Sequence, residues 1–314
     1  MSRPKLIIMC GLSGSGKSTI AKKLAKTMKD TVIVSSDSIR EEVFNNYEDT
    51  EHNTDVFKIY HKRIKNALEN NHNVIADATN LTMKSRRATL EYVKGMDIKK
   101  VCYIIPKPFE QCKIDNQNRE HPVPDEVLDK QIRKFQIPFV GDGFDRIYLY
   151  TSDKWNKYKL SALNLFLNMY DFDQRNLHHN ETLERHCKSV ASLFSQSKIY
   201  SILLSENKYA ADALITGALL HDIGKLSTQI FDDNGVAHYI NHSEVGAYKV
   251  LTQMLIPPTW SNGMLFICCF IINYHMFPFG LEKATEKTKQ RWKKRFGEIN
   301  YQMLLEFHKC DIAR

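Results

Sequence analysis

Residues 11–18 read Gly11-Leu12-Ser13-Gly14-Ser15-Gly16-Lys17-Ser18, and this stretch decides the fold of the first half of the chain. It fits the pattern G-x-x-x-x-G-K-[ST], directly after an apolar run at Lys5–Cys10 and directly before a helical pattern at 18–28. Glycines allow the backbone N–H groups to surround phosphates, and the start of a helix adds the positive end of its dipole. A flexible glycine turn, the alternative, does not explain the flanking strand and helix. The loop is therefore predicted to bind ATP or GTP.

The side chains of this loop have separate expected roles. Lys17 supplies a positive charge to the β- and γ-phosphates, and the Ser18 hydroxyl ligates Mg²⁺. A nucleoside triphosphate, ATP or GTP, and Mg²⁺ are thus the cofactors expected for this half of the chain. The residues expected to contact the nucleotide are Ser13, Gly14, Ser15, Gly16, Lys17, Ser18 and Thr19.

Short runs rich in β-branched residues alternate with helical patterns up to about residue 150. Strands are predicted at 5–10, 31–35, 73–76, 100–105 and 146–150. Helices are predicted between them at 18–28, 56–69, 83–93 and 109–119. Such alternation is typical of a parallel sheet with helices on both faces. The first half is therefore predicted to be an α/β domain.

The pattern changes after Thr151. No convincing strand follows, and helical periodicity is found at 162–169, 182–194, 210–220, 242–254 and 264–274. The second half is therefore predicted to be all-α. A chain of 314 residues suits two cores of about 150 residues each. The domains are expected at 1–155 and 156–314, with the junction close to Trp155.

Composition limits the classes of protein that fit. With 43% hydrophobic and 25% charged residues, the chain matches neither a disordered nor a membrane protein, and no apolar run reaches the roughly 18 residues of a spanning helix. No secretion signal is recognised at the start. The seven cysteines are odd in number and form no C-x-x-C pair, which indicates reduced thiols and a cytoplasmic protein. A net charge of +8 favours a polyanionic partner such as nucleic acid.

Two aspartates follow predicted strands of the first half. Ligands of open α/β sheets lie beyond the carboxyl ends of the strands, so Asp37 and Asp77 are expected near the phosphates. Asp37 can accept a proton from an attacking hydroxyl, and Arg40, one helical turn on, can bind an anionic acceptor. The alternative for Asp37 is the N-cap of a helix that begins at Ser38. Asp77 is expected to orient a Mg²⁺-bound water or Lys17, and its alternative is a structural turn carboxylate.

Residues 4–150 resemble phage-type polynucleotide kinases, which transfer the γ-phosphate of ATP to a 5′-hydroxyl end of a nucleic acid. The resemblance implies that Asp37 is the general base, Arg40 binds an acceptor phosphate, and Arg119 is a lid arginine on the transferring phosphoryl group. The family pattern also tends to have a second arginine near Asp115 or Asn116, and no basic residue stands there. The motifs that carry the resemblance are Asp37-x-x-Arg40, Asp77-Ala78-Thr79-Asn80, Arg86-Arg87, Asn116-Gln117-Asn118-Arg119 and the segment Val123 to Leu128.

The second half contains a His-Asp pair in an apolar setting. His221 and Asp222 follow the predicted helix at 210–220, and a buried imidazole and carboxylate require a compensating partner, commonly a divalent metal. Further residues of ligand type are His186, His242, His275 and Asp311. The alternatives are a capping or core role for His275 and a helix N-terminal role for His242. His179 could share the helix face of His186, and His238 is expected at the surface.

These residues resemble the HD-domain phosphohydrolases over about residues 170–314. The resemblance implies a metal site of His186, His221, Asp222 and Asp311, with His242 and His275 at the positions of a second metal. Imidazole and carboxylate ligands suit one or two ions of Mn, Fe, Co, Ni or Zn, which assist the hydrolysis of phosphate esters. Lys225 is expected to neutralise a phosphate oxygen, and its alternative is a charge at a helix C-terminus.

Together, the two halves favour an enzyme that repairs the ends of broken RNA. The kinase half phosphorylates a 5′-hydroxyl, and the HD half removes a 2′,3′-cyclic phosphate or a 2′- or 3′-phosphate; DNA ends are left open. A separate RNA ligase is the implied partner. Alternatives are a small-molecule or nucleotide kinase fused to a nucleotidase, and an ATP sensor with a non-catalytic HD module. A basic segment at 283–295 with Trp292 fits phosphate contacts and base stacking, or a solvated helix face.

Overall fold

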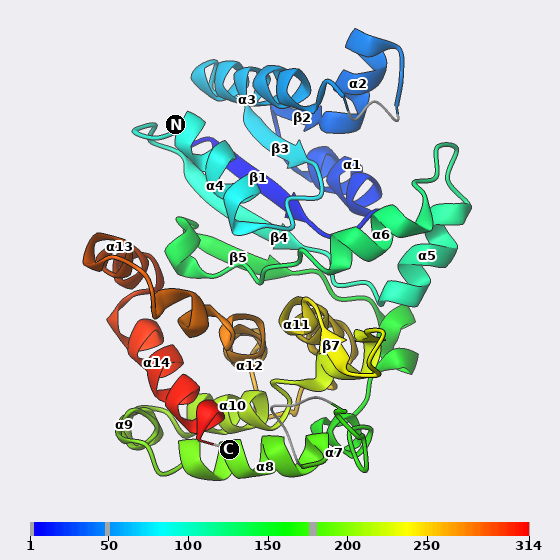
Figure 1. Cartoon of the computed structure of the whole chain (residues 1–314). Coiled ribbons are helices and arrows are strands. Elements are labelled where there is room, and N and C mark those ends of the chain that lie inside the picture. Colours follow the sequence, from blue (N-terminus) through cyan, green and yellow to red (C-terminus); the bar gives the residue numbers. More distant parts are fainter. Residues whose placement is uncertain (1–2, 48–50, 176–180, 314) are drawn as a thin grey trace. The chain divides into compact units, whose positions relative to one another are not determined.

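A computed structural model describes residues 3–47, 51–175 and 181–313 of the chain (Figure 1). The chain forms two compact units. The first comprises Met1–Gln131 and Pro138–Asp153, and the second comprises Ile132–Ile137 and Lys154–Arg314. The main junction at Asp153–Lys154 lies beside the expected one, whereas the short segment 132–137 belongs to the second unit. The side chain of Asn273 explains this placement, because its amide accepts from Ile137 N (2.6 Å) and donates to Phe135 O (3.2 Å).

The first unit is built on a five-stranded parallel sheet with the strand order β2-β3-β1-β4-β5. Every residue of β1 after Lys5 is buried, and so is every residue of β3 after Asn73. Because successive side chains of a strand point to opposite faces, both faces of the sheet are covered at its centre. The strands are β1 (Lys5–Cys10), β2 (Thr31–Ser35), β3 (Asn73–Asp77), β4 (Lys99–Ile104) and β5 (Arg146–Leu149). The predicted α/β fold and the positions of all five strands are confirmed, with limits that differ by at most one residue.

Helices of the first unit follow the strands in the order typical of βαβ crossovers. They are α1 (Lys17–Thr27), α2 (Ser36–Phe44), α3 (Asn53–Glu69), α4 (Met83–Tyr92), α5 (Phe109–Gln117), α6 (Asp125–Ile132) and the short 3-10 helix η1 (Val140–Asp142). The buried Arg86 of α4 donates to Asp142 of η1 at 2.8 Å and to the carbonyls of Asn80 and Leu81 at 3.2 and 3.1 Å. This arginine therefore fixes the loop that follows β3.

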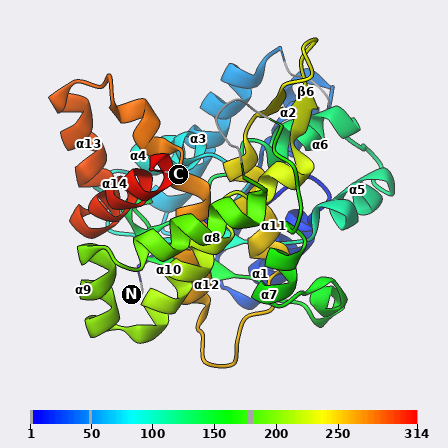
Figure 2. The same ribbon diagram turned by 60° about the horizontal axis from the view of Figure 1, so that its bottom comes forward.

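The second unit is largely helical (Figure 2). Its elements before the hairpin are η2 (Asp153–Tyr158), α7 (Ala162–Leu167), α8 (Leu183–Phe194), α9 (Lys198–Glu206), α10 (Lys208–Leu219) and η3 (Ile223–Ser227). Those after it are α11 (His242–Gln253), α12 (Asn262–Tyr274), η4 (Phe277–Leu281), α13 (Glu286–Phe296) and α14 (Glu298–Ile312). α12 packs against both α10 and α11 in the core, where Leu265, Cys268 and Ile272 are fully buried.

The prediction that the second half is all-α is wrong in one place. Residues Gln229–Phe231 (β6) and Ala237–Tyr239 (β7) form an antiparallel hairpin. Its turn is stabilised by Asp232 Oδ1, which accepts from the backbone N–H groups of Asn234 (2.9 Å) and Val236 (3.0 Å). Strands of three residues are too short to show alternating hydrophobicity, so periodicity missed them.

No helix among the described residues is long and apolar enough to span a membrane.

Candidate functional site

The loop after β1 has the geometry of a phosphate-binding loop. Gly16 caps α1 in the left-handed region (φ 91°), and Gly14 also has a positive φ of 75°. A Cβ on Gly14 would lie 2.1 Å from the carbonyl oxygen of Cys112, so only glycine fits there. Lys17 Nζ donates to Leu12 O at 2.7 Å, which folds the lysine across the loop. Burial lowers the pKa of Lys17, against the opposing effect of the nearby Asp77 carboxylate.

Asp77 ends β3 beside this loop. It pairs in register with Ser35 of β2, and it is buried at 5% exposure. Burial raises the pKa of the Asp77 carboxyl, although Lys17 and a hydrogen bond with Ser18 act in the opposite direction. A hydroxyl and a carboxylate in contact are hard oxygen ligands of the kind Mg²⁺ prefers. Ser18 and Asp77 therefore fit a Mg²⁺ that accompanies a nucleotide.

The alternative role of Asp37 as a helix N-cap is wrong. α2 begins at Ser36, and Ser35 caps it by accepting from Ser38 N. Asp37 lies between two arginines instead: its Oδ1 accepts from Arg40 at 3.1 Å, and its Oδ2 lies 3.7 Å from Arg119. The Asp37 side chain is 45% exposed, so a ligand can reach it. The structure thus brings together the predicted base and the two predicted arginines.

Lys107 is a residue of this site that sequence reasoning missed. Its Nζ donates to Gly14 O of the phosphate-binding loop at 2.8 Å and pairs with Asp115. Lys107 follows β4, so the rule that ligands lie beyond the carboxyl ends of strands could have found it. Asp115 and Asn116 lie where the family pattern tends to have a second arginine. Asp115 pairs with Lys107, and both amide atoms of Asn116 bind the backbone of Val123.

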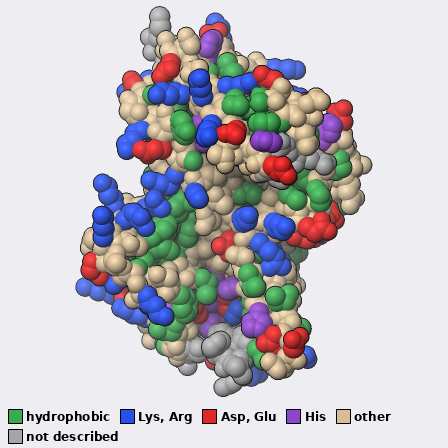
Figure 3. Space-filling model, turned by 45° about the horizontal axis from the view of Figure 1, so that its top comes forward, with side chains coloured by type: hydrophobic (Ala, Val, Ile, Leu, Met, Phe, Trp, Pro, Cys, Tyr) green, Lys and Arg blue, Asp and Glu red, His purple; other side chains and the backbone are tan. Residues whose placement is uncertain are grey.

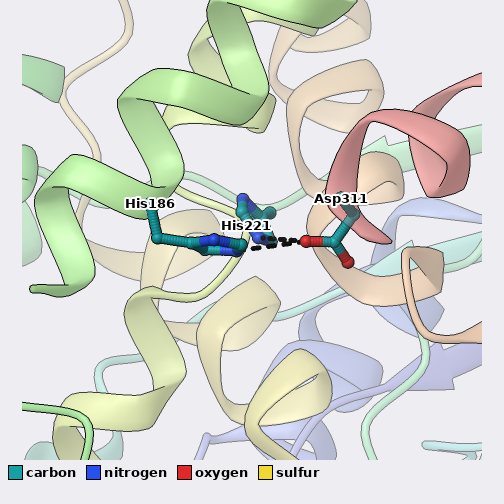
Figure 4. Close-up of side chains that lie close together, drawn as sticks. All are labelled: His186, His221 and Asp311. Atoms are coloured by element: carbon teal, nitrogen blue, oxygen red, sulfur yellow. Dashed lines mark hydrogen bonds and ion pairs between the residues drawn. The ribbon is translucent and has the colours of Figure 1, made fainter. Parts of the chain in front are cut away.

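A second cluster lies inside the second unit. Figure 4 shows His186 of α8, His221 after α10 and Asp311 of α14 pointing toward one another. Asp311 Oδ1 lies 3.1 Å from His186 Nε2 and 3.5 Å from His221 Nε2. Asp222 Oδ2 lies 3.4 Å from His221 Nε2 and 3.7 Å from His186 Nε2. The four residues with the strongest sequence signal therefore converge from three helical segments.

The other oxygen of Asp222 faces two further histidines. Its Oδ1 lies 3.0 Å from His242 Nε2 and 3.4 Å from His275 Nε2. His242 approaches because η3 and α11 lie very close: a Cβ on Gly224 would stand 1.9 Å from His242 O. One carboxylate thus lies between two sets of imidazoles. Each set of donor atoms would fit one metal ion.

The imidazoles are oriented as metal ligands usually are. The Nδ1 atoms of His221, His242 and His275 each lie 2.8 Å from a backbone carbonyl oxygen. This contact directs the Nε2 atom of each ring toward Asp222. Among the described residues, His221 Nε2 is buried without a hydrogen-bond partner. Donor atoms that bind one ion at about 2.1 Å lie about 3.0–3.4 Å apart, close to the separations found here. The cluster therefore fits a divalent transition metal.

Electrostatics keep both carboxylates ionised. Burial by itself raises the pKa of Asp222, but Lys225 and His221 hold this pKa well below its usual range. Burial by itself also raises the pKa of Asp311, but the neighbouring His186 and His221 imidazoles outweigh this effect and hold the pKa below its usual range. An ionised carboxylate is the form that binds a metal.

Lys225 faces the His/Asp cluster, and it also stands in the last turn of a short helix, as its alternative role requires. It lies in η3, where its Nζ pairs with Asp222 Oδ2 (2.7 Å) and donates to Gln174 (2.8 Å). Cys187, whose thiol lies within 4.8 Å of donor atoms of His221 and Asp222, is a further member that the sequence reading did not single out. His238 is exposed and pairs with Asp232 at 3.2 Å, as expected for a surface residue. His179 lies outside the described residues.

Comparison with protein families gives one match for the first unit. Residues 6–138 match the family model described as "AAA domain". The L-seryl-tRNA(Sec) kinase of Methanococcus maripaludis is 32% identical over 147 residues, which are 45% of this chain and 56% of that protein. The chain therefore spans about half the length of this relative. Together with the loop geometry, the match identifies a P-loop domain, and it stops before the His/Asp cluster.

Several solved structures resemble part of the chain. A chain of the Pnkp1/Rnl/Hen1 RNA repair complex has a TM-score of 0.39 and 24% identity, over 43% of this chain and 44% of that one. A fungal RNA kinase has a TM-score of 0.36 and 16% identity, over 55% and 86%. A gluconokinase from Sinorhizobium meliloti has a TM-score of 0.34 and 19% identity, over 48% and 83%.

Proposed function

We propose that the chain is a bifunctional enzyme that repairs the ends of broken RNA. The first unit transfers the γ-phosphate of ATP to a 5′-hydroxyl end. The second unit is an HD-type phosphohydrolase that removes a 2′,3′-cyclic phosphate, or a 2′- or 3′-phosphate, from the other end. Both changes must precede sealing, so a separate RNA ligase is the partner in this proposal. The cellular location is taken to be the cytoplasm, in keeping with seven free cysteines.

The kinase step uses residues at one edge of the sheet. The 5′-hydroxyl oxygen attacks the γ-phosphorus, the bond to the β,γ-bridging oxygen breaks, and ADP leaves with that electron pair. Asp37 accepts the hydroxyl proton. Arg40 holds the acceptor phosphate, while Arg119 and Lys17 balance the charge of the transferring group. The contacts of Asp37 with both arginines support these roles.

The hydrolytic step belongs to the His/Asp cluster. His186, His221, Asp222 and Asp311 would hold one divalent ion, and His242 and His275 with Asp222 would hold a second. An ion of Mn, Fe, Co, Ni or Zn bound there would supply an activated water and polarise the phosphorus. Lys225, buried beside Asp222, is placed to hold a phosphate oxygen of the substrate. For a cyclic phosphate, one water adds to phosphorus and one ester P–O bond breaks, which leaves a 2′- or 3′-phosphate and one free ribose hydroxyl. A second water then breaks the remaining ester bond, so that inorganic phosphate leaves and the 2′,3′-diol is complete.

The observation that carries the proposal is the position of Asp222, whose two oxygens each face a pair of imidazoles at 3.0–3.7 Å. A structural histidine cluster has no need of four imidazoles around one carboxylate. The presence of this cluster in one chain with a P-loop and an arginine-flanked Asp37 favours two phosphate chemistries on one substrate.

The experiment that tests the proposal uses one RNA and reads both of its ends. A 20-nucleotide RNA with a 5′-hydroxyl and a 2′,3′-cyclic phosphate is incubated with ATP, Mg²⁺ and Mn²⁺, and the product ends are separated. We expect a 5′-phosphate and a free 2′,3′-diol. Asp37→Asn is expected to block only the first change and Asp222→Asn only the second, so each variant is the control for the other.

Other outcomes would favour other functions. Phosphate transfer to a metabolite or nucleotide, with RNA ends inert, would support a small-molecule kinase joined to a nucleotidase. Transfer to the serine of seryl-tRNA would place the chain with the relative named above. ATP binding without transfer, together with untouched phosphate esters, would support an ATP sensor with a non-catalytic HD module.

A further inference from the structure

A row of cations without partners runs along α13. Lys283, Lys287, Arg291 and Lys294 are all exposed, and within the described part of the chain none of them makes a hydrogen bond or an ion pair. Residues four or three apart lie on one face of a helix, so Lys287, Arg291 and Lys294 form one stripe, whereas Lys283 lies before the helix begins at Glu286. We name Lys287, Arg291 and Lys294 the cationic stripe.

The remaining cations of α13 are engaged with the protein itself. Lys289 pairs with Glu286 at 2.9 Å, and Lys293 pairs with Glu298 at 2.8 Å. Arg295 lies over the ring of Trp292 at 4.5 Å. Among the described cations of α13, those of the stripe are therefore the ones without a partner in the protein. The whole segment 283–295 carries a net charge of +6.

Trp292 does not offer a free surface for stacking a base. Its ring stacks on Phe296 at 5.3 Å and meets Phe277 edge-on at 4.8 Å. The indole thus anchors the helix, and the idea that a base stacks on it is not supported by this packing. Any ligand of the stripe is recognised by its charge and not by its bases.

α13 is fixed to the elements that carry the His/Asp cluster. Phe296 is 3% exposed and packs edge-on against Phe270 and Tyr274 of α12, and Tyr274 directly precedes His275. α13 also packs against α14, whose last turn carries Asp311. Figure 3 shows Lys and Arg side chains gathered over this part of the second unit. The stripe is therefore held rigidly in the unit that contains the hydrolytic site.

We propose that the cationic stripe binds the phosphodiester backbone of the RNA whose end is processed in the second unit. This inference rests on the proposed function. Cations at i and i+4 are about 6 Å apart along a helix, which matches the separation of successive phosphates along an extended strand. Binding through phosphates alone is independent of sequence, as suits an enzyme that treats ends of any sequence. A membrane-binding helix would expose apolar residues beside its cations, whereas Trp292 and Phe296 are turned into the protein.

The test compares two triple variants with the same loss of charge. The stripe variant is Lys287→Gln, Arg291→Gln and Lys294→Gln. The control is Lys188→Gln, Lys198→Gln and Lys208→Gln, three exposed lysines on α8, α9 and α10 that have no partner among the described residues. Binding of a fluorescent 20-nucleotide RNA is measured by anisotropy across a range of salt concentrations.

Three lost phosphate contacts should reduce the slope of log K against log salt by about 2, at roughly 0.7 per contact on a single strand. The control should change the slope by less than about 0.7, the value of one contact. A third variant, Lys287→Arg with Lys294→Arg, keeps the charge and should keep the slope. An unchanged slope in the stripe variant, an equal loss in the control, or tighter binding to an acidic peptide or to phosphatidylserine vesicles than to RNA would overturn the proposal.

A small substrate separates this inference from the proposed function. Hydrolysis of bis(4-nitrophenyl) phosphate should be the same in the stripe variant and in the wild type, because the stripe is not part of the metal cluster. The KM for a 20-nucleotide cyclic-phosphate RNA should rise at least tenfold, and that for a dinucleotide should not. A reduced salt slope without any phosphate chemistry would leave the RNA surface standing and refute the end-healing function. Normal end healing with an unchanged slope would refute the RNA-binding role of the stripe and leave the end-healing function standing.

Discussion

The two sites of this chain are built in opposite ways. The P-loop places most of its phosphate ligands in eight consecutive residues, Gly11 to Ser18, and its Asp37 is 45% exposed. The His/Asp cluster gathers six residues from positions 186 to 311, and Asp222 at its centre is 3% exposed. A contiguous site owes its shape to local backbone conformation, whereas a dispersed site owes its shape to the packing of a whole unit. The two should therefore respond differently to mutation and to pH.

The largest expected effect is at the centre of the dispersed site. Asp222→Asn removes the charge that both sets of imidazoles and Lys225 face, so metal binding and hydrolysis of 2′,3′-cyclic phosphate ends should fall to background. Metal content after dialysis and hydrolysis of the RNA end are the measurements.

The controls compare hydrolysis with and without metal, and hydrolysis with phosphate transfer, in the same preparations. Chelation of the wild type should reproduce the loss of hydrolysis, and added Mn²⁺ should restore it in the wild type but not in the variant. Transfer of phosphate from ATP should continue in Asp222→Asn, since the P-loop has its own ligands. Full hydrolysis by the variant would remove the cluster from the mechanism.

The second effect is at the contiguous site. Asp37→Asn keeps the shape of the side chain but cannot accept a proton, so phosphate transfer should slow by about 10²–10⁴. Ser35→Ala is the control, because it removes the N-cap of α2 and costs about 1 kcal/mol of stability without touching the base. Single-turnover transfer to a 5′-hydroxyl RNA is the measurement. Near-normal transfer by Asp37→Asn would remove Asp37 as the general base.

More of the first site than of the second could be predicted from the sequence. The P-loop was readable because strand, motif and helix are adjacent in the chain, and the end-of-strand rule added Asp37 and Asp77. The same rule was not applied to the strand at Lys99–Ile104, and so Lys107 was missed. In the second unit, the apolar setting of His221 and Asp222 and the resemblance to HD-domain phosphohydrolases suggested the histidines. Only the fold shows that Asp222 divides its oxygens between them.

Three features lay beyond any pattern in the sequence. The hairpin β6–β7 has strands too short for periodicity, and the segment 132–137 joins the second unit through the side chain of Asn273 from a distant helix. The thiol of Cys187 near His221 depends on how α8 packs against α10. Contacts of this kind link residues far apart in sequence, and spacing carries no information about them.

A third prediction tests whether a buried ion pair of the first unit is as indispensable as Asp222 is in the second. Arg86 and Asp142 are both fully buried, so Arg86→Met leaves an unpaired carboxylate and should cost about 3–5 kcal/mol. The double variant Arg86→Met with Asp142→Leu should recover much of this loss, because both charges are then absent.

The measurement must separate the two units. All three tryptophans, Trp155, Trp260 and Trp292, lie in the second unit, so their fluorescence reports the unfolding of that unit alone. Hydrogen exchange of peptides from β1 and β3 reports the first unit. We expect faster exchange in the single variant with unchanged tryptophan fluorescence in urea. A double variant less stable than Arg86→Met would show that the pair itself, and not the orphaned charge, stabilises the fold.

The smallest effect concerns pH and a buried histidine of the first unit. His61 of α3 stacks on Tyr92 at 4.5 Å and contacts Thr89 at 3.2 Å, and burial lowers its pKa to about 4. The unfolded chain has the ordinary value of about 6.5, so it binds a proton first as the pH falls. The contribution of His61 to the free energy of unfolding of the first unit is therefore fully present above about pH 6.5, and this free energy should decrease by about 2 kcal/mol at pH 5.

The variant His61→Gln can still bond to Thr89 but does not titrate. Its free energy of unfolding should therefore decrease less between pH 7 and pH 5, as measured by hydrogen exchange of β1 and β3 corrected for intrinsic rates. An equal loss in both proteins would place the pH sensitivity elsewhere in the unit, for which the carboxyl of Asp77, with its raised pKa, has the wrong sign.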